Sequence, residues 1–216
     1  MKIFKNILAV LFPQKCLGCK KENEILCHNC LLKISRPDTP HLNGVHIAGN
    51  YQDLVLKKAL WLLKYQGVKQ LAKPLAELIK ERVWKKLETA APDIALRSQG
   101  GRENWLVVPI PLSKKKLRHR GYNQAEMIAR ELSDNVRADI MFKKFHTKSQ
   151  VEVKDKEERL ANIAGSFEVR NPETIKGKKI ILIDDVLTTG ATMREAKKVL
   201  KQAGAKKVIG IVVAKG

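Results

Sequence analysis

The sequence has no long apolar run, few aromatic residues and no cysteine beyond residue 30. A bilayer-spanning helix needs about 18 or more consecutive apolar residues, so the sequence predicts no such helix. Residues Met1–Phe12 combine positive charge with a short apolar stretch, but Pro13-Gln14-Lys15 stands where a signal peptide needs small residues for cleavage. We therefore expect residues 1–12 to form a short helix that packs on the body of a cytoplasmic protein.

Acidic residues are scarce relative to basic ones. The chain has 42 Lys and Arg but only 22 Asp and Glu, which gives a formal charge of +20. Such an excess attracts polyanions, whether nucleic acid, phosphorylated metabolites or an anionic membrane face. The alternative is a solvated basic surface without such a partner. With 44% hydrophobic residues over 216 positions, the chain is not disordered, and its length suits one full domain with a small appendage.

The four cysteines form two Cys-x-x-Cys pairs separated by seven residues. Such pairs are the two knuckles of a tetrahedral zinc site, in which tight turns bring the thiolates to one ion. A segment of about 30 residues cannot bury enough apolar surface to fold alone, so we expect a bound metal to stabilise its fold. The alternative is a redox-active thiol pair or reduced cysteines without metal. The pattern favours a structural Zn²⁺ site formed by Cys16, Cys19, Cys27 and Cys30.

Apolar patterning predicts alternating strands and helices after a linker at residues 35–40. Short continuous apolar runs predict three buried strands, over residues 105–110, 179–183 and 208–213, with a weaker strand at 46–51. Helical periodicity predicts helices over residues 53–65, 70–87, 123–133 and 192–203. The second half therefore forms βαβ units with a parallel sheet. We predict an N-terminal helix and four-cysteine module over residues 1–36, followed by an α/β domain over residues 41–216.

The most specific motif follows the second of these strands. Asp184 and Asp185 stand at the carboxyl end of an aliphatic run, where open α/β sheets bind ligands. The turn that follows opens a helix, so its backbone N–H groups and the helix dipole favour an anion. The carboxylates suit sugar hydroxyls or a hydrated Mg²⁺. The alternative is an aspartate pair that caps a helix beside an ordinary turn. Further donors and a close backbone approach come from Thr188, Thr189, Gly190 and Thr192.

This string, Ile-Asp-Asp-Val-Leu-Thr-Thr-Gly-Ala-Thr, resembles the phosphoribosyl pyrophosphate (PRPP) signature of type I phosphoribosyltransferases. The resemblance implies their fold, a parallel sheet flanked by helices. It further implies that Asp184 and Asp185 are catalytic residues that bind the ribose hydroxyls and the metal shell, with Mg²⁺ neutralising the pyrophosphate. The same resemblance implies a 5-phosphate held by Thr188, Thr189, Gly190, Ala191 and Thr192.

A second motif is a basic segment that follows the first strand of the α/β domain, and we expect it to be a loop. No acidic residue occurs between Glu103 and Glu126. One hypothesis is a pyrophosphate clamp that uses Lys116 and Arg120, because arginine presents a planar fork to phosphate oxygens. Another is a track for a nucleic-acid backbone, with Tyr122 stacking on a base; a solvated loop is the third. The basic residues are Lys114, Lys115, Lys116, Arg118, His119 and Arg120.

Taken together, the motifs resemble the ComF (ComFC-like) competence family. Further matching elements are Lys64-Tyr65-Gln66-Gly67, Val108-Pro-Ile-Pro111, Arg120-Gly-Tyr-Asn-Gln124, and the set Thr147, Gln150, Arg159 and Asn162. The polar stretch that holds this last set is either a lid over the ligand or an inert surface loop.

The resemblance implies a zinc-bearing, PRPP-binding protein that acts in the uptake or processing of single-stranded DNA during natural competence. It implies the competence helicase as a partner, which could hold the protein at the inner face of the membrane. The alternative hypothesis is an active Mg-dependent phosphoribosyltransferase that transfers ribose 5-phosphate from PRPP to a nitrogenous acceptor. A third hypothesis is a PRPP or nucleotide sensor that alters partner binding.

Overall fold

The computed structural model describes residues 14–90, 105–144 and 165–216. The helix predicted over residues 1–12 and the polar residues Thr147, Gln150, Arg159 and Asn162 lie outside the described residues. Within the described ranges, no helix is both long and apolar enough to cross a membrane.

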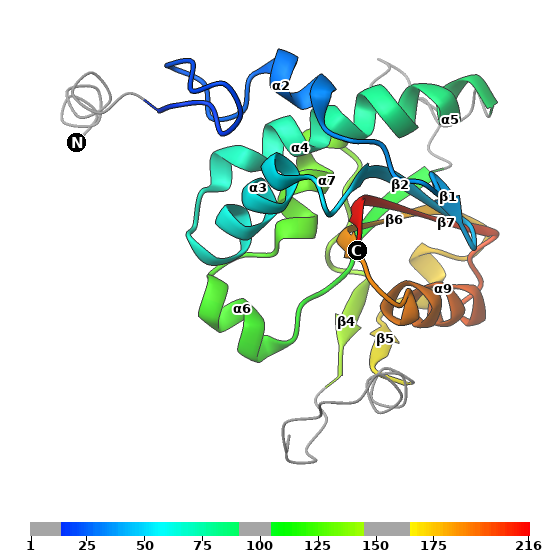
Figure 1. Cartoon of the computed structure of the whole chain (residues 1–216). Coiled ribbons are helices and arrows are strands. Elements are labelled where there is room, and N and C mark those ends of the chain that lie inside the picture. The colour runs from blue at the N-terminus through cyan, green and yellow to red at the C-terminus, as the bar shows by residue number, and fades with distance from the viewer. Residues whose placement is uncertain (1–13, 91–104, 145–164) are drawn as a thin grey trace.

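A five-stranded sheet lies at the centre of the molecule (Figure 1), in the order β1-β2-β7-β6-β3. The edge strand β1 runs antiparallel to β2, and all the other neighbours run parallel. This arrangement confirms the predicted parallel α/β sheet. The strands are β1 (His41–Leu42), β2 (Val45–Asn50), β3 (Trp105–Pro109), β6 (Lys179–Leu187) and β7 (Lys207–Lys215).

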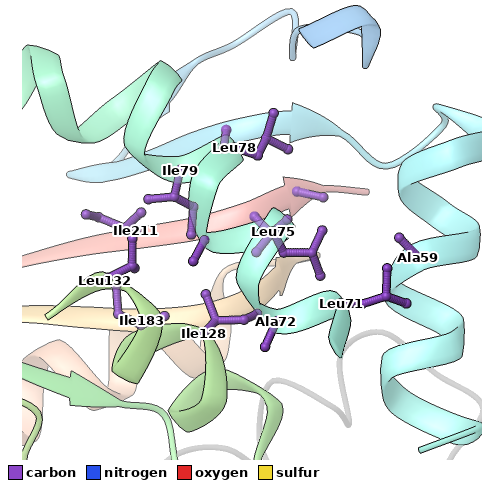
Figure 2. Close-up of a cluster of buried hydrophobic side chains, with 14 of the residues drawn as sticks. Ala59, Leu71, Ala72, Leu75, Leu78, Ile79, Ile128, Leu132, Ile183 and Ile211 are labelled. Atoms are coloured by element: carbon purple, nitrogen blue, oxygen red, sulfur yellow. The ribbon is translucent and has the colours of Figure 1, made fainter. Parts of the chain in front are cut away.

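Both faces of the sheet are covered by helices. Successive side chains of a strand point to opposite faces, so an apolar strand needs apolar partners on both sides. Ile181 and Ile183 of β6 contribute to one buried cluster, whereas Ile180 and Leu182 contribute to the other. Helices α3 (Leu54–Tyr65), α4 (Ala72–Ile79) and α7 (Gln124–Leu132) cover the first face, and α9 (Ala191–Gln202) covers the second. Figure 2 shows Leu75 and Ile128 of the helices in the first cluster together with Ile183 and Ile211 of the sheet.

The predicted helices of the first half form, with one change of geometry. Asp53 caps α3 by accepting hydrogen bonds from the backbone N–H groups of Val55 and Leu56, both at 3.0 Å. The stretch predicted as one helix over residues 70–87 is a succession of a 3₁₀ turn η1 (Lys69–Leu71), α4, a π-helical turn η2 (Lys80–Trp84) and α5 (Lys85–Ala90). The π-helical turn places the guanidinium of Arg82 inside the molecule.

The cysteine segment packs on this half of the molecule. Its helix α2 (His28–Lys33) contributes Leu31 to the first buried cluster, and Ile34 follows it there. Arg82 donates hydrogen bonds to the carbonyl oxygens of Leu32, Ile34 and Ser35, at the end of α2 and just after it, and to that of Ala48 in β2. The division into modules at residues 36 and 41 remains a prediction.

The sequence did not predict a second, two-stranded sheet. Strands β4 (Met141–Lys143) and β5 (Phe167–Val169) pair antiparallel below the main sheet, and a 3₁₀ turn η4 (Pro172–Thr174) follows. Three-residue strands carry too little alternation to be recognised from sequence.

Candidate functional site

The aspartate pair occupies the last part of β6. Strands β3 and β7 flank β6 in parallel, so this part of the strand lies at the edge where the carboxyl ends of three strands meet. The preceding residues Ile180–Ile183 are fully buried, as predicted. The strand itself continues beyond the predicted end, through Asp184 and Asp185 to Leu187.

The two carboxylates differ in their surroundings. The backbone N–H of Asp185 donates to Oδ1 of Asp184 at 2.8 Å. Oδ1 of Asp185 forms an ion pair with Nζ of Lys64 at 2.9 Å, and both side chains are mostly buried, at 13% and 17% exposure. Burial raises the pKa of Asp184 to about 7, and repulsion from Asp185 adds to this, whereas the backbone N–H bond and the charges of Lys64 and Lys116 oppose it.

Lys64 is a site residue to which the sequence analysis assigned no role. It lies in the last turn of α3, where a cation is favoured by the helix dipole. Its position within the Lys-Tyr-Gln-Gly motif was the available signal, but no spacing rule links it to an aspartate on a distant strand. The structure shows that the motif supplies a counterion to the aspartate pair.

Two further lysines lie near the same carboxylates. The charge of Lys116 acts on the pKa values of both Asp184 and Lys143, so the three groups are electrostatically connected. Burial lowers the pKa of Lys143 in β4, repulsion from Lys116 lowers it further, and attraction to Asp184 opposes the change. Lys143 was not predicted, because β4 itself was not. The site therefore combines two carboxylates with at least three amino groups, which suits a ligand with hydroxyl and phosphate groups.

The turn after β6 opens α9, as the sequence predicted. Gly190 has a φ of 74° and caps the helix; a Cβ at this position would lie 3.2 Å from Nη1 of Arg194. The hydroxyl of Thr189 accepts a hydrogen bond from the N–H of Ala191 at 3.3 Å, and Arg194 donates to the Thr189 carbonyl at 2.9 Å. Thr188 is exposed and Thr192 is half-buried. The turn thus places these residues at the N-terminus of α9, where an anion is favoured, and the phosphate site remains a prediction.

The basic segment is a helix, and the predicted loop is wrong. Helix α6 (Lys114–Arg120) begins after Ser113, whose hydroxyl accepts from the Lys116 N–H at 3.3 Å. It ends at Gly121, which has a φ of 76° and donates its N–H to the Leu117 carbonyl at 2.8 Å. A serine N-cap and a glycine C-cap eight residues apart were the signal that the charge pattern obscured.

Arg120 lies against α3. Its Nη1 donates to Oε1 of Gln124 at 2.9 Å, and its guanidinium lies 5.1 Å from the ring centre of Tyr65. The hydroxyl of Tyr122 donates to the carbonyl of Leu63. The Arg-Gly-Tyr-Asn-Gln motif therefore attaches α6 to the end of α3, beside Lys64.

The four predicted metal ligands come together. Their Sγ atoms all lie within 4.8 Å of one another, and Cys16 and Cys27 are buried. The Sγ of Cys27 lies 3.6 Å from that of Cys16 and 3.7 Å from that of Cys19. Zinc–sulfur bonds of about 2.3 Å in a tetrahedron place sulfur atoms about 3.8 Å apart, so this cluster could bind a metal ion such as zinc.

Known proteins resemble the second half of the chain. The model of the phosphoribosyl transferase domain matches residues 117–216, which include α7, the aspartate pair and the threonine turn. The competence protein ComFC of Streptococcus pneumoniae is 41% identical over 101 residues, 47% of this chain and 44% of that protein. The competence protein F of Haemophilus influenzae is 33% identical over 108 residues, 47% of this chain and 46% of that protein. The second half of the chain is therefore similar to the phosphoribosyl transferase domain and to the competence proteins ComFC and F.

A longer match reaches beyond residues 117–216. The DNA utilization protein YhgH of Salmonella typhimurium is 24% identical over 210 residues, 88% of this chain and 84% of that protein. The matches to the competence proteins, by contrast, span less than half of their length. The chain therefore spans less than half of the length of the competence proteins that it matches, and the similarity supports the phosphoribosyltransferase fold of residues 117–216.

Proposed function

We propose that this ComFC-like protein binds PRPP or a related phosphoribosyl ligand at its aspartate pair and acts on single-stranded DNA during natural competence. The observation that carries the first part is the placement of Asp184 and Asp185 directly before the threonine turn, with Lys64 and Lys116 beside them. A sugar phosphate needs acceptors for its hydroxyls and donors for its phosphate, and this edge of the sheet offers both.

Each predicted residue has a role in this proposal. Asp184 and Asp185 accept hydrogen bonds from the ribose hydroxyls, and Lys116 and Arg120 face the pyrophosphate. The 5-phosphate is bound by the turn formed by Thr188, Thr189, Gly190, Ala191 and Thr192. Carboxylate oxygens are ligands that Mg²⁺ prefers, so the donor set fits this ion. When bound, Mg²⁺ neutralises the pyrophosphate of PRPP, as in phosphoribosyltransferases generally.

Calorimetric titration of the zinc-loaded protein with PRPP and Mg²⁺ tests the ligand site. Asp185→Asn keeps the shape of the side chain and removes its charge, so we expect binding to weaken at least tenfold. Asp139→Asn is the matched control, because Asp139 is an exposed carboxylate that pairs with Arg137. Binding that is equal in all three proteins, or absent in the unmodified protein, contradicts the proposed site.

The role in DNA handling rests on the relatives and on charge. The matching proteins are named competence and DNA utilization proteins, and a net charge of +20 favours a polyanion. We propose single-stranded DNA and the competence helicase as partners, in the cytoplasm and at the inner face of the membrane. Affinity for single-stranded DNA should fall steeply as salt rises from 50 to 200 mM, because phosphate contacts release counterions (roughly tenfold or more for several contacts). Binding that ignores salt contradicts this role.

An active phosphoribosyltransferase is the second candidate function, and the intact aspartate pair and threonine turn favour it. It would transfer ribose 5-phosphate to a nitrogenous acceptor with Mg²⁺. Release of pyrophosphate from PRPP with candidate bases tests this function, and no release with any base would leave binding as the role of the site. A site that binds PRPP without turnover and changes DNA affinity would be a sensor.

We further propose that the four cysteines bind a structural Zn²⁺. Four cysteine thiolates fill the tetrahedral coordination of one zinc ion, so no position stays open for the water or substrate that a catalytic zinc binds. Metal analysis of the purified protein should find one zinc per chain, and removal of zinc should unfold this segment. A metal-free protein with an unchanged thermal transition contradicts a structural role.

A further inference from the structure

Helix α3 exposes two aromatic side chains on its outer face. Trp61 is 48% exposed and Tyr65 is 55% exposed, whereas Trp84 and Trp105 are only 5% and 3% exposed. Trp61 and Tyr65 are one helical turn apart, and their ring centres are 6.2 Å apart. Large aromatic rings left adjacent on a surface commonly mark a binding site, because their burial is favourable.

This aromatic pair is continuous with the basic helix α6. The guanidinium of Arg120 lies 5.1 Å from the ring centre of Tyr65, and Figure 1 shows α6 directly below α3. No acidic residue occurs between Asp53 and Glu77 or between Glu103 and Glu126, so both helices have only neutral and basic side chains. We call this the aromatic–basic surface: Trp61, Tyr65, Lys114, Lys115, Arg118 and His119, with Arg120 at its border to the aspartate site.

We propose that the aromatic–basic surface binds single-stranded DNA, with bases stacked on Trp61 and Tyr65 and the backbone phosphates on α6. This inference rests on the proposed role in DNA handling and assigns it to one surface. Aromatic rings stack on unpaired bases of any sequence, while nearby lysine and arginine neutralise the phosphates. A duplex hides the faces of its bases and leaves the rings without a partner. A second copy of this chain would place two strongly basic surfaces against each other.

Tryptophan fluorescence tests the surface directly, because Trp61 is the exposed one of the three tryptophans. Oligothymidylate should quench the emission of the unmodified protein, and Trp61→Phe should lose the quenching but retain most of the affinity. In a separate anisotropy assay with a labelled strand, we expect Trp61→Ala and Tyr65→Ala each to weaken binding about tenfold. Tyr65→Phe retains the ring and should bind within about twofold of the unmodified protein.

Two controls separate the surface from general effects. Leu32→Ala removes an exposed apolar side chain of α2, and it should leave DNA affinity unchanged. Both aromatic residues are about half exposed, so the variants Trp61→Ala and Tyr65→Ala should unfold at the same temperature as the unmodified protein. A thermal melt of each variant verifies this.

The outcomes distinguish this inference from the proposed function. Retained affinity in Trp61→Ala and Tyr65→Ala overturns the surface and leaves DNA handling in place. No binding of single-stranded DNA by the unmodified protein overturns both. Quenching of Trp61 by vesicles of phosphatidylserine and phosphatidylcholine, with none by oligothymidylate, assigns the surface to a membrane and overturns the inference.

Discussion

Arg82 joins the cysteine segment to the sheet domain, and its replacement by methionine measures this connection. The side chain is 8% exposed, and its guanidinium donates to the carbonyls of Leu32, Ile34, Ser35 and Ala48. Methionine fills a similar volume and donates nothing. The carbonyls would then lose the guanidinium as donor, and that of Ser35 keeps another donor, the N–H of Asn50 at 3.1 Å.

The expected loss of stability follows from the burial of these carbonyls. The bonds to Ile34 and Ala48 are buried, and those to Leu32 and Ser35 are partly buried, where water can replace the donor. A buried unsatisfied carbonyl costs about 1–3 kcal/mol, so two such carbonyls cost about 2–6 kcal/mol. Methionine avoids the desolvation of a buried guanidinium, which offsets part of this cost. We expect Arg82→Met to lower the free energy of unfolding by about 2–4 kcal/mol.

Urea unfolding of the zinc-loaded protein measures this free energy, and zinc release to a coloured chelator reports on the cysteine segment. Arg82→Met should release zinc faster than the unmodified protein, because the end of α2 loses its attachment. Arg82→Lys retains the charge but not the fork, so it should lie between the two. Arg137→Met, at an exposed ion pair, is the control and should change stability by less than about 1 kcal/mol. Equal stability and equal zinc release in Arg82→Met would refute the reasoning.

Three further predictions follow from single contacts. Lys64→Met should lower the free energy of unfolding, measured in urea, by about 2 kcal/mol, because Asp185 then remains mostly buried without its partner. The double variant Lys64→Met with Asp185→Asn should recover most of this loss. An equal loss in the single and the double variant would contradict the prediction. Burial, aided by nearby positive charges, lowers the pKa of His46 to about 4 from 6.5, so between these pH values the unfolded state binds a proton that the folded state does not. The free energy of unfolding should therefore fall as pH drops from 6.5 to 4, by about 1–2 kcal/mol after allowance for partial exposure. His46→Leu should make the free energy of unfolding depend less steeply on pH in this range. An unchanged pH dependence in His46→Leu would exclude this residue as its source. Gly18→Ala places a Cβ 2.7 Å from Sγ of Cys30, which displaces this ligand, so the variant should release zinc to a chelator faster than the unmodified protein. An unchanged release rate in a folded variant would show that the turn adapts to the added Cβ.

The sequence predicted those features that depend on local pattern. The aliphatic run of β6 and the periodicity of α7 and α9 fixed the parallel sheet, because burial on both faces leaves a continuous apolar signal. The two Cys-x-x-Cys pairs similarly predicted a cluster that the structure forms. In each case the decisive residues are near one another along the chain.

Contacts between distant segments were not predictable in this way. The pairing of Lys64 with Asp185 joins a helix end to a strand end across the sheet, and no sequence period encodes such a distance. Lys143, whose pKa is influenced by the charge of Asp184, comes from a three-residue strand. The helical form of α6 was predictable from its caps, but the run of like charges obscured them. A charge run therefore indicates a ligand class more reliably than it indicates backbone conformation.

Helix α3 connects the cysteine segment, the aspartate pair and the aromatic–basic surface through residues at its two ends. At its start, Asp53 accepts a hydrogen bond from the N–H of Ser35, just after the cysteine segment, at 2.8 Å. At its end, Lys64 binds Asp185 while the adjacent Tyr65 meets Arg120. A ligand that binds Asp185 shares this carboxylate with Lys64, which is the residue next to Tyr65 of the aromatic–basic surface. The two binding assays are therefore not independent, and DNA affinity has to be measured both with and without PRPP and Mg²⁺ before either site is interpreted alone.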